Sequence, residues 1–209
     1  MKLGAEDIEA MEKRHRAAFV NCLSGFKSAN LVGTADASGQ TNLAIMSSTV
    51  HLGSHPPLLA LVIRPGGEER HTLKNILETG VYSINHVNPD IVEAAHQTAA
   101  RYPMETSEFD VTGLTPCWEE GFAAPMVREA RVKLGMALRE HIELSINKTH
   151  LVIGEVVLAE LPPESYRTDG SIDLAAAGSV ALTGLDSYHQ SVRCKRMAYA
   201  KPDLPPREI

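Results

Sequence analysis

The chain has 209 residues, with 20 basic and 26 acidic side chains and a formal net charge of −6. This length is enough for a single domain with a sizeable core. The negative charge argues against a dedicated nucleic-acid-binding protein, which would present a basic face. The three cysteines are widely spaced, and the histidines lack metal-ligand spacing, so we expect neither a disulfide framework nor a metal site.

The N-terminal residues are charged and lack the apolar run of a signal peptide. No segment is long and apolar enough to span a bilayer, so we expect a cytoplasmic protein without a membrane segment. Residues 5–23 carry apolar side chains near helical spacing and predict an amphipathic helix. In the expected organisation, residues 1–209 form one domain in which residues 1–27 contribute this N-terminal helix.

Apolar runs at residues 29–35, 43–50, 58–64 and 81–87 predict strands. The connections at residues 36–39 and 51–57 are rich in Gly, Pro, Asp and Ser, which favour turns, so the pattern indicates a meander. Two helices are also expected. The first spans residues 72–79 and is closed by Gly80, and the second begins at the capping residue Asn88 and continues to about Arg101.

Residues 102–125 contain three prolines and predict an ordered excursion. Residues 131–146 and 149–161 predict two long strands joined as a hairpin, and residues 162–209 form a loop-rich extension. The strands do not alternate with crossover helices, which favours a mainly β, α+β fold built on an antiparallel barrel with a few attached helices. Neither a Rossmann fingerprint nor a P-loop is present.

Residues 42–49 combine an amide, hydroxyls and small or flexible apolar side chains. Small residues let the backbone approach a planar ring, so this segment is a candidate wall for a flat cofactor. The alternative is an ordinary strand with a polar outer face. The candidate residues here are Asn42, Ala44, Ile45, Met46, Ser47, Ser48 and Thr49.

A second candidate group lies where the helix of residues 72–79 begins. A helix N-terminus offers unpaired N–H groups, and arginine, histidine and threonine side chains add donors for a phosphate. The alternative is that Thr72 only caps the helix and Arg70 is solvated. The candidates of this group are Arg64, Arg70, His71, Thr72 and Lys74.

Asn85 and His86 end the strand of residues 81–87. They are candidates for bordering the ring or a bound nicotinamide, and the alternative is a hydrogen-bonded strand end. Ser47 and Ser48 lack the GxSxG surroundings of a nucleophile, which argues against acyl transfer.

The order and spacing of residues 41–48, 53–59, 70–76 and 83–86 resemble the flavin reductase-like family of FMN-binding split barrels, and the likeness extends from about residue 28 to 188. This resemblance implies a Greek-key split β-barrel and a homodimer with non-covalent FMN near the subunit interface. It places residues 42–49 against the isoalloxazine and ribityl chain and residues 70–74 at the phosphate. It also places Asn85, His86 and Tyr188 near the cofactor.

Two positions depart from the family pattern. Many relatives carry Asp where this chain has His71, and an aromatic residue where it has Met46. A histidine suits a phosphate at least as well as Asp, whereas Met46 removes a ring that would stack near the flavin.

The resemblance implies an NAD(P)H-dependent flavin oxidoreductase that transfers hydride to FMN and hands reduced flavin to a partner oxygenase or another acceptor. The cofactor carries the chemistry, so no catalytic side chain is assigned. Two alternatives stay open: a flavin-binding electron carrier without nicotinamide activity, and a pyridoxine-phosphate-type split-barrel oxidase.

Overall fold

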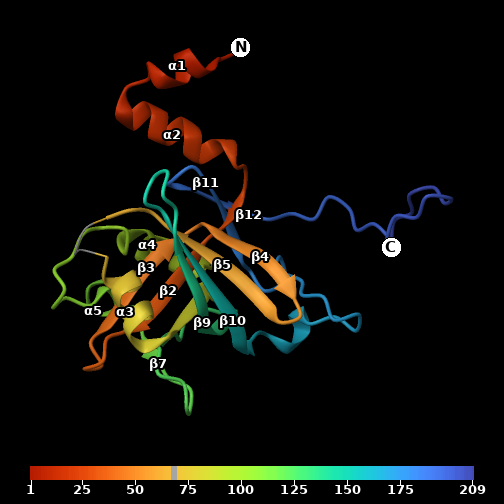
Figure 1. Cartoon of the computed structure of the whole chain (residues 1–209). Helices are drawn as coiled ribbons and strands as arrows, with labels where there is room; N and C mark the ends of the chain where they lie inside the picture. Colours follow the sequence, from red (N-terminus) through yellow and green to blue (C-terminus); the bar gives the residue numbers. More distant parts are fainter. Residues whose placement is uncertain (67–69) are drawn as a thin grey trace.

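The computed structural model describes residues 1–66 and 70–209, and its body is a strongly bent antiparallel sheet with short helices attached (Figure 1). The strands are β1 (Lys27–Ser28), β2 (Asn30–Ala35), β3 (Thr41–Met46), β4 (Thr49–Ser54), β5 (Pro57–Ile63), β6 (Val81–His86), β7 (Pro116–Cys117), β8 (Met126–Val127), β9 (Lys133–Glu143), β10 (His150–Glu160), β11 (Val180–Thr183) and β12 (Ser187–Gln190). The helices are α1 (Ala5–Glu9), α2 (Lys13–Leu23), α3 (His71–Thr79), α4 (Val92–Gln97) and α5 (Glu108–Thr112), with 3-10 turns at Pro89–Ile91 and Pro163–Ser165.

The main sheet has seven strands in the order β3-β2-β6-β9-β10-β5-β4, and each neighbouring pair is antiparallel. The mainly β architecture with a few helices is therefore as predicted, but the simple meander is not. β3 and β4 follow each other in the chain yet lie at opposite ends of the strand order. The chain crosses between these edges at Ser47 and Ser48, where the Ser48 carbonyl accepts a hydrogen bond from the Val62 N–H at 2.9 Å.

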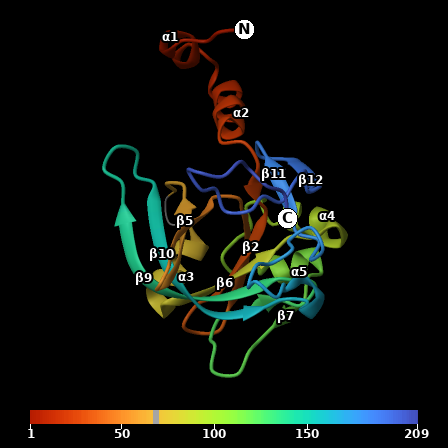
Figure 2. The ribbon, with the colours of Figure 1, turned by 90° about the vertical axis from the view of Figure 1, so that its right-hand side faces the viewer.

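Two hydrophobic cores hold this sheet in place. One contains Leu61, Ile76 and Tyr82 and is covered by α3. The other contains Leu43 and Phe109 and joins β2 and β3 to α4, α5 and β11. β11 belongs to a small three-stranded sheet with β1 and β12, and Figure 2 shows β11 and β12 side by side. The packing thus brings the segment after β6 and the β11–β12 hairpin onto the sheet next to β3.

Three predicted boundaries in the N-terminal half are wrong. The run at residues 43–50 is not one strand, because β3 ends at Met46 and β4 begins at Thr49. The expected connection at residues 51–57 largely forms β4, an edge strand that pairs with β5 and has an irregularity in its register between His51 and Gly53. The expected single helix over residues 5–23 is two helices, α1 and α2, neither of which has a buried residue, so no core packing enforces one continuous helix. Among the described residues, no helix is long and apolar enough to cross a membrane.

Other local predictions are confirmed. α3 ends at Gly80, whose φ of 73° is the left-handed conformation that glycine adopts easily. The side chain of Asn88 accepts a hydrogen bond from the Asp90 N–H at 3.0 Å and caps the turn before α4. β9 and β10 form the long hairpin, although the helical segment after Asn88 ends at Gln97 rather than near Arg101. The loop-rich extension also contributes β11 and β12.

Candidate functional site

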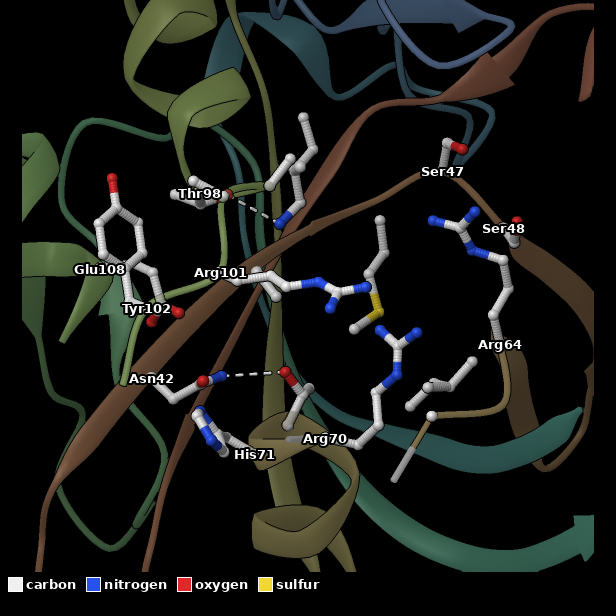
Figure 3. A pocket seen from close by; sticks show the side chains of 18 of the residues that line it. Asn42, Ser47, Ser48, Arg64, Arg70, His71, Thr98, Arg101, Tyr102 and Glu108 are labelled. Atoms are coloured by element: carbon white, nitrogen blue, oxygen red, sulfur yellow. Dashed lines mark hydrogen bonds between the residues drawn. The ribbon is translucent and has the colours of Figure 1, made fainter. Parts of the chain in front are cut away.

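A cavity of about 1010 Å³ opens where the end of β5, the start of α3 and the β3–β4 crossing meet. Residues 98–104 and Leu182 and Leu185 of the β11–β12 hairpin line its other walls. Figure 3 shows that polar and cationic side chains from these separate segments point into one space. The volume lies at the upper end of the range typical of sites for small molecules and cofactors.

The start of α3 forms one end of the cavity. Arg70 is the N-cap residue, and its side chain does not cap the helix. The first N–H groups of a helix lack intrahelical partners and carry the positive end of the helix dipole. The side chains of Arg70, His71 and Thr72 line the cavity at the same place. This end of the cavity is therefore suited to an anion.

The Thr72 hydroxyl is held by a buried polar network. Asn42 donates a hydrogen bond from Nδ2 to Thr72 Oγ1 at 2.9 Å (Figure 3) and makes a longer contact of 3.3 Å with Thr34 Oγ1. Asn75 of α3 donates to the same Thr34 oxygen at 3.1 Å. A hydroxyl that accepts a hydrogen bond still has one proton to donate. The network thus ties β2, β3 and α3 together and fixes the position of Thr72 on the cavity wall.

Three arginine side chains reach the cavity from different segments. Arg64 follows β5, Arg70 precedes α3, and Arg101 follows α4. In Figure 3, Arg101 and Arg64 approach from opposite sides and Arg70 lies between them. Arg70 also donates from Nη2 to the Pro65 carbonyl at 3.2 Å. Guanidinium groups bind phosphate and carboxylate oxygens with paired hydrogen bonds, so this arrangement favours an anionic ligand.

The wall formed by β3 is apolar and is supported from behind. Ala44 and Met46 line the cavity together with Val62 of β5. Within the part of the chain that the structure describes, the outer edge of β3 has no strand of the main sheet beside it. Instead, the Leu43 N–H donates to Glu108 Oε2 at 2.8 Å and the Ile45 N–H donates to Thr98 Oγ1 at 2.9 Å. These two side chains hold β3 in place and satisfy backbone groups that would otherwise lack partners.

Glu108 is the acidic residue among the described residues that line the cavity, and only 6% of it is exposed. Burial raises the pKa of this carboxyl, while the hydrogen bond from the Leu43 N–H and the nearby His71 side chain oppose the shift. The cavity therefore combines several cationic groups with one carboxyl whose protonated form is favoured by its surroundings.

Most of the predicted site residues lie on this cavity. The segment before β4 and the start of α3 are brought together, as the sequence indicated. The predicted residues that line the cavity are Asn42, Ala44, Ile45, Met46, Ser47, Ser48, Arg64, Arg70, His71 and Thr72.

Four predicted residues are not part of the cavity lining. Thr49 accepts a hydrogen bond from Asn30 at 3.2 Å, and Lys74 is exposed on α3. Asn85 is fully buried, because its side chain bonds the Leu31 carbonyl, Ser83 Oγ and the Val127 N–H inside the sheet. His86 bonds Ser179 Oγ through Nδ1 at 2.9 Å.

Tyr188, which the resemblance places near the cofactor, is also absent from this lining and contacts His96 through its hydroxyl at 3.1 Å.

The structural role of His86 leads to a testable pH dependence. Burial lowers the pKa of His86 to about 4, whereas the imidazole of the unfolded chain has its ordinary pKa of about 6.5. Between these two pH values the unfolded chain binds a proton that the folded chain does not. Stability contributed by the neutral imidazole is present above pH 6.5 and is lost as the pH falls toward 4. We expect this loss to reach about 2 kcal/mol at pH 5.

Urea unfolding at pH 7 and pH 5 measures this contribution. The decrease in unfolding free energy between the two pH values should be smaller by about 2 kcal/mol in His86→Gln than in the original chain. An identical decrease in both proteins would show that His86 does not titrate in this way.

The sequence reasoning missed one wall of the cavity. The sequence predicts Thr98 and Arg101 at the end of a helix, and it places Tyr102 and Glu108 only within the ordered excursion of residues 102–125. The sequence signal for this wall is the cationic side chain of Arg101 and the aromatic side chain of Tyr102, which stand before Pro103 at the end of the predicted helix. That signal does not reveal that the segment packs along the outer edge of β3.

Comparisons with known proteins agree with the fold. The model of the flavin reductase like domain matches residues 23–175. A solved structure from Shewanella frigidimarina NCIMB 400, assigned as a flavin reductase with a split barrel domain, is 52% identical. The match covers 96% of this chain and 100% of that chain with a TM-score of 0.93. The split-barrel fold expected from the sequence is thereby confirmed.

Two further similarities are more distant. Nitrilotriacetate monooxygenase component B from Bacillus cereus has the same fold, with 22% identity, a TM-score of 0.81, and coverage of 92% of this chain and 96% of that chain. The uncharacterized protein YwrF of Bacillus subtilis is 31% identical over 140 residues, which are 65% of this chain and 68% of YwrF.

Proposed function

The chain belongs to the flavin reductase-like family, and we propose that it binds FMN in the cavity beside β3 and α3 and transfers hydride from NAD(P)H to this flavin. The observation that carries the proposal is the meeting of an anion-binding helix start with an apolar strand wall in one cavity. FMN has a phosphate at one end and a flat ring at the other, so it requires both features together.

The residues present fit the phosphate end of this cofactor. The first N–H groups of α3, the Arg70 side chain and the Thr72 hydroxyl are hydrogen-bond donors at one position. Asn42 keeps the Thr72 oxygen engaged as an acceptor, which directs the remaining hydroxyl proton elsewhere. In this proposal Arg64 and Arg101 add positive charge on the other sides of the phosphate.

The residues also fit the ring. Ala44 is small, Met46 adapts its shape to a flat surface, and Val62 adds a second apolar wall. Ser47 and Ser48 lie where the chain passes from β3 to β4, and both residues line the cavity. We propose that they bond the polar edge of the ring.

Bound FMN would supply the hydride chemistry, as flavins do in other proteins. The chain itself would hold the phosphate, orient the ring against β3 and keep the opposite side accessible to the nicotinamide. The hydrogen bonds that the Leu43 and Ile45 N–H groups donate to Glu108 and Thr98 fix this wall before the cofactor binds. No side chain is required to act as an obligatory acid or base.

We further propose that the protein acts as a homodimer and passes reduced flavin to an oxygenase or another acceptor. The name of the Bacillus cereus protein, a component of a monooxygenase, supports this direction, although the similarity to it concerns the fold. The physiological location proposed from the sequence is the cytoplasm.

Anaerobic spectroscopy tests the proposed reaction. The protein is saturated with FMN, freed of excess cofactor, and mixed with NADH or NADPH in a stopped-flow instrument. Loss of the flavin absorbance with either nicotinamide is the expected result. Failure to retain FMN would overturn the proposal, and bleaching by dithionite alone would indicate an electron carrier. Turnover of pyridoxamine phosphate without nicotinamide would indicate the oxidase alternative.

Glu108 should weaken the binding of the phosphate. Gln at this position keeps an oxygen that accepts the Leu43 N–H but removes the negative charge near the cationic cavity. We therefore expect Glu108→Gln to bind FMN about five times more tightly at pH 8, which corresponds to about 1 kcal/mol.

The FMN affinities of Glu108→Gln and of the original chain should become equal as the pH falls through the raised pKa of Glu108. The Glu108 carboxyl of the original chain is then neutral, as the Gln side chain is. Fluorescence titrations of both proteins at the same pH values cancel the titration of the FMN phosphate itself. A ratio that does not change with pH would contradict this role.

A further inference from the structure

Strands β9 and β10 form a long hairpin whose turn projects from the body (Figure 2), and this hairpin brings two histidines together. In the register of the two strands, His141 lies opposite Val152 and His150 lies opposite Glu143. His141 and His150 are therefore diagonal neighbours on the same face of the sheet. Nε2 of His141 is 3.0 Å from Nδ1 of His150, and the ring centroids are 5.2 Å apart. Two imidazole nitrogens thus meet at one place on the hairpin.

These two imidazoles have the chemistry of a pair of metal ligands. A neutral imidazole has one nitrogen with a lone pair, and this nitrogen is a common ligand of divalent zinc, nickel and copper. Both rings are only partly buried, so an ion with its water ligands can reach them from solvent. In the structure the two rings share a single hydrogen bond. An ion between the two nitrogens replaces this hydrogen bond with two coordination bonds.

The separation of the two nitrogens discriminates among these ions. For metal–nitrogen bonds of about 2.0–2.1 Å, two ligands at a right angle are about 3.0 Å apart, whereas two ligands at the tetrahedral angle are about 3.4 Å apart. The observed separation of 3.0 Å corresponds to the right angle. Right-angled ligands are typical of the square-planar or tetragonal coordination of Cu²⁺ and Ni²⁺, whereas structural Zn²⁺ sites are tetrahedral. The geometry therefore favours Cu²⁺ or Ni²⁺.

The structure around the hairpin turn holds the two histidines at this separation. The Leu144 N–H donates to the Thr149 carbonyl at 2.8 Å, and the Thr149 N–H donates to Asn147 Oδ1 at 3.1 Å. His150 is also paired with Ile63 of β5 on its other side. Ligands carried by paired strands keep their geometry better than ligands carried by loops. Little additional order is required when an ion binds, which favours binding.

The groups beside the pair limit the site to these two protein ligands. Glu143 lies opposite His150, but its carboxylate pairs with the Lys148 ammonium group at 3.0 Å. This ion pair largely compensates the positive charge of Lys148, which reduces its repulsion of a cation at the histidines. Within residues 1–66 and 70–209, no group of three or more His, Cys, Asp or Glu side chains is arranged to hold a metal ion. The other coordination positions are therefore filled by water.

We propose that His141 and His150 together bind one divalent nickel or copper ion. Neither histidine lines the flavin cavity, so this site is separate from the proposed flavin site and does not depend on FMN. The two histidines are nine positions apart in the chain, which is outside the short spacings that indicate a metal site in a sequence. The register of β9 with β10 brings them together.

Calorimetric titration of the untagged protein with nickel chloride tests the site. We expect the original chain to bind one Ni²⁺ per chain. His141→Gln and His150→Gln should each weaken Ni²⁺ binding by roughly tenfold or more, since a ligand matters at least as much as the groups that orient it. His15→Gln is the matched control, because it removes an exposed histidine of α2 rather than one of the hairpin. Thermal unfolding without added metal checks that the variants are folded.

Electron paramagnetic resonance gives a second measurement, which identifies the ligands directly. With one equivalent of Cu²⁺, the spectrum should show coupling to two imidazole nitrogens in the original chain and in His15→Gln, and to fewer in His141→Gln. A Cu²⁺ spectrum of the original chain without two such couplings would overturn the inference. Absence of Ni²⁺ binding by the original chain would overturn it too, and so would equal Ni²⁺ affinities in the original chain and His141→Gln or equal weakening by His15→Gln. Neither measurement involves a flavin, so failure here is distinguishable from failure of the proposed function.

Discussion

Replacement of Arg70 by glutamine should weaken FMN binding by roughly 10- to 100-fold and leave riboflavin binding within about twofold, because a charge-assisted hydrogen bond contributes about 1.5–3 kcal/mol. Arg70 is the N-cap residue of α3 and lines the cavity beside Thr72. Riboflavin lacks the phosphate, so its affinity reports only on the ring and the ribityl chain. Fluorescence quenching of both flavins measures the two dissociation constants.

Lys74→Gln is the matched control for this change. It removes the same charge from the same helix, but Lys74 is exposed and does not line the cavity. We expect its effect on FMN affinity to stay below about threefold, since exposed charges at a distance are screened by salt. Equal losses of FMN and riboflavin in Arg70→Gln, or equal effects of the two substitutions on FMN, would place the phosphate elsewhere.

Replacement of Ala44 by phenylalanine should abolish the binding of both flavins. Ala44 is paired with Val32 in the β2–β3 ladder and lines the cavity on the proposed ring side. A phenyl group there would occupy the space that the isoalloxazine requires. We expect both affinities to fall by roughly 100-fold or more, which is about 3 kcal/mol. The two substitutions therefore have different expected effects. Arg70→Gln weakens the binding of FMN but not of riboflavin, whereas Ala44→Phe weakens the binding of both flavins.

Ala44→Ser is the size-matched control and should change either affinity by less than about threefold, because it adds a single oxygen atom. Thermal unfolding of all three proteins checks that the fold is intact. A folded Ala44→Phe variant that binds riboflavin as tightly as the original chain would contradict the placement of the ring against β3.

The sequence predicted those parts of the fold that depend on local chemistry. Gly80 closes α3 through its positive φ, and Asn88 caps the next turn through its side chain. The order of the strands depends instead on pairing between distant segments. β3 and β4 are adjacent in the chain but lie at opposite sheet edges, which no local pattern at Ser47 and Ser48 reveals. β4 also forms only because β5 provides its partner.

The same distinction applies to the site. The segment of residues 42–48 and the helix start at residues 70–72 carry hydroxyl and cationic groups that the sequence displays, and the structure brings them to one cavity. Arg101 and Glu108 reach this cavity because Thr98 and Glu108 bond the outer edge of β3. Asn85 has the amide expected of a ligand-binding residue, but the backbone groups around it already use its hydrogen-bonding capacity.

A crystal structure of the protein with FMN tests the central claim most directly. The account predicts that the phosphate lies at the first turn of α3 within hydrogen-bond distance of the Thr72 hydroxyl, and that the ring lies beside Ala44 and Met46. A phosphate bound away from α3, or a ring on another face of the sheet, would contradict it.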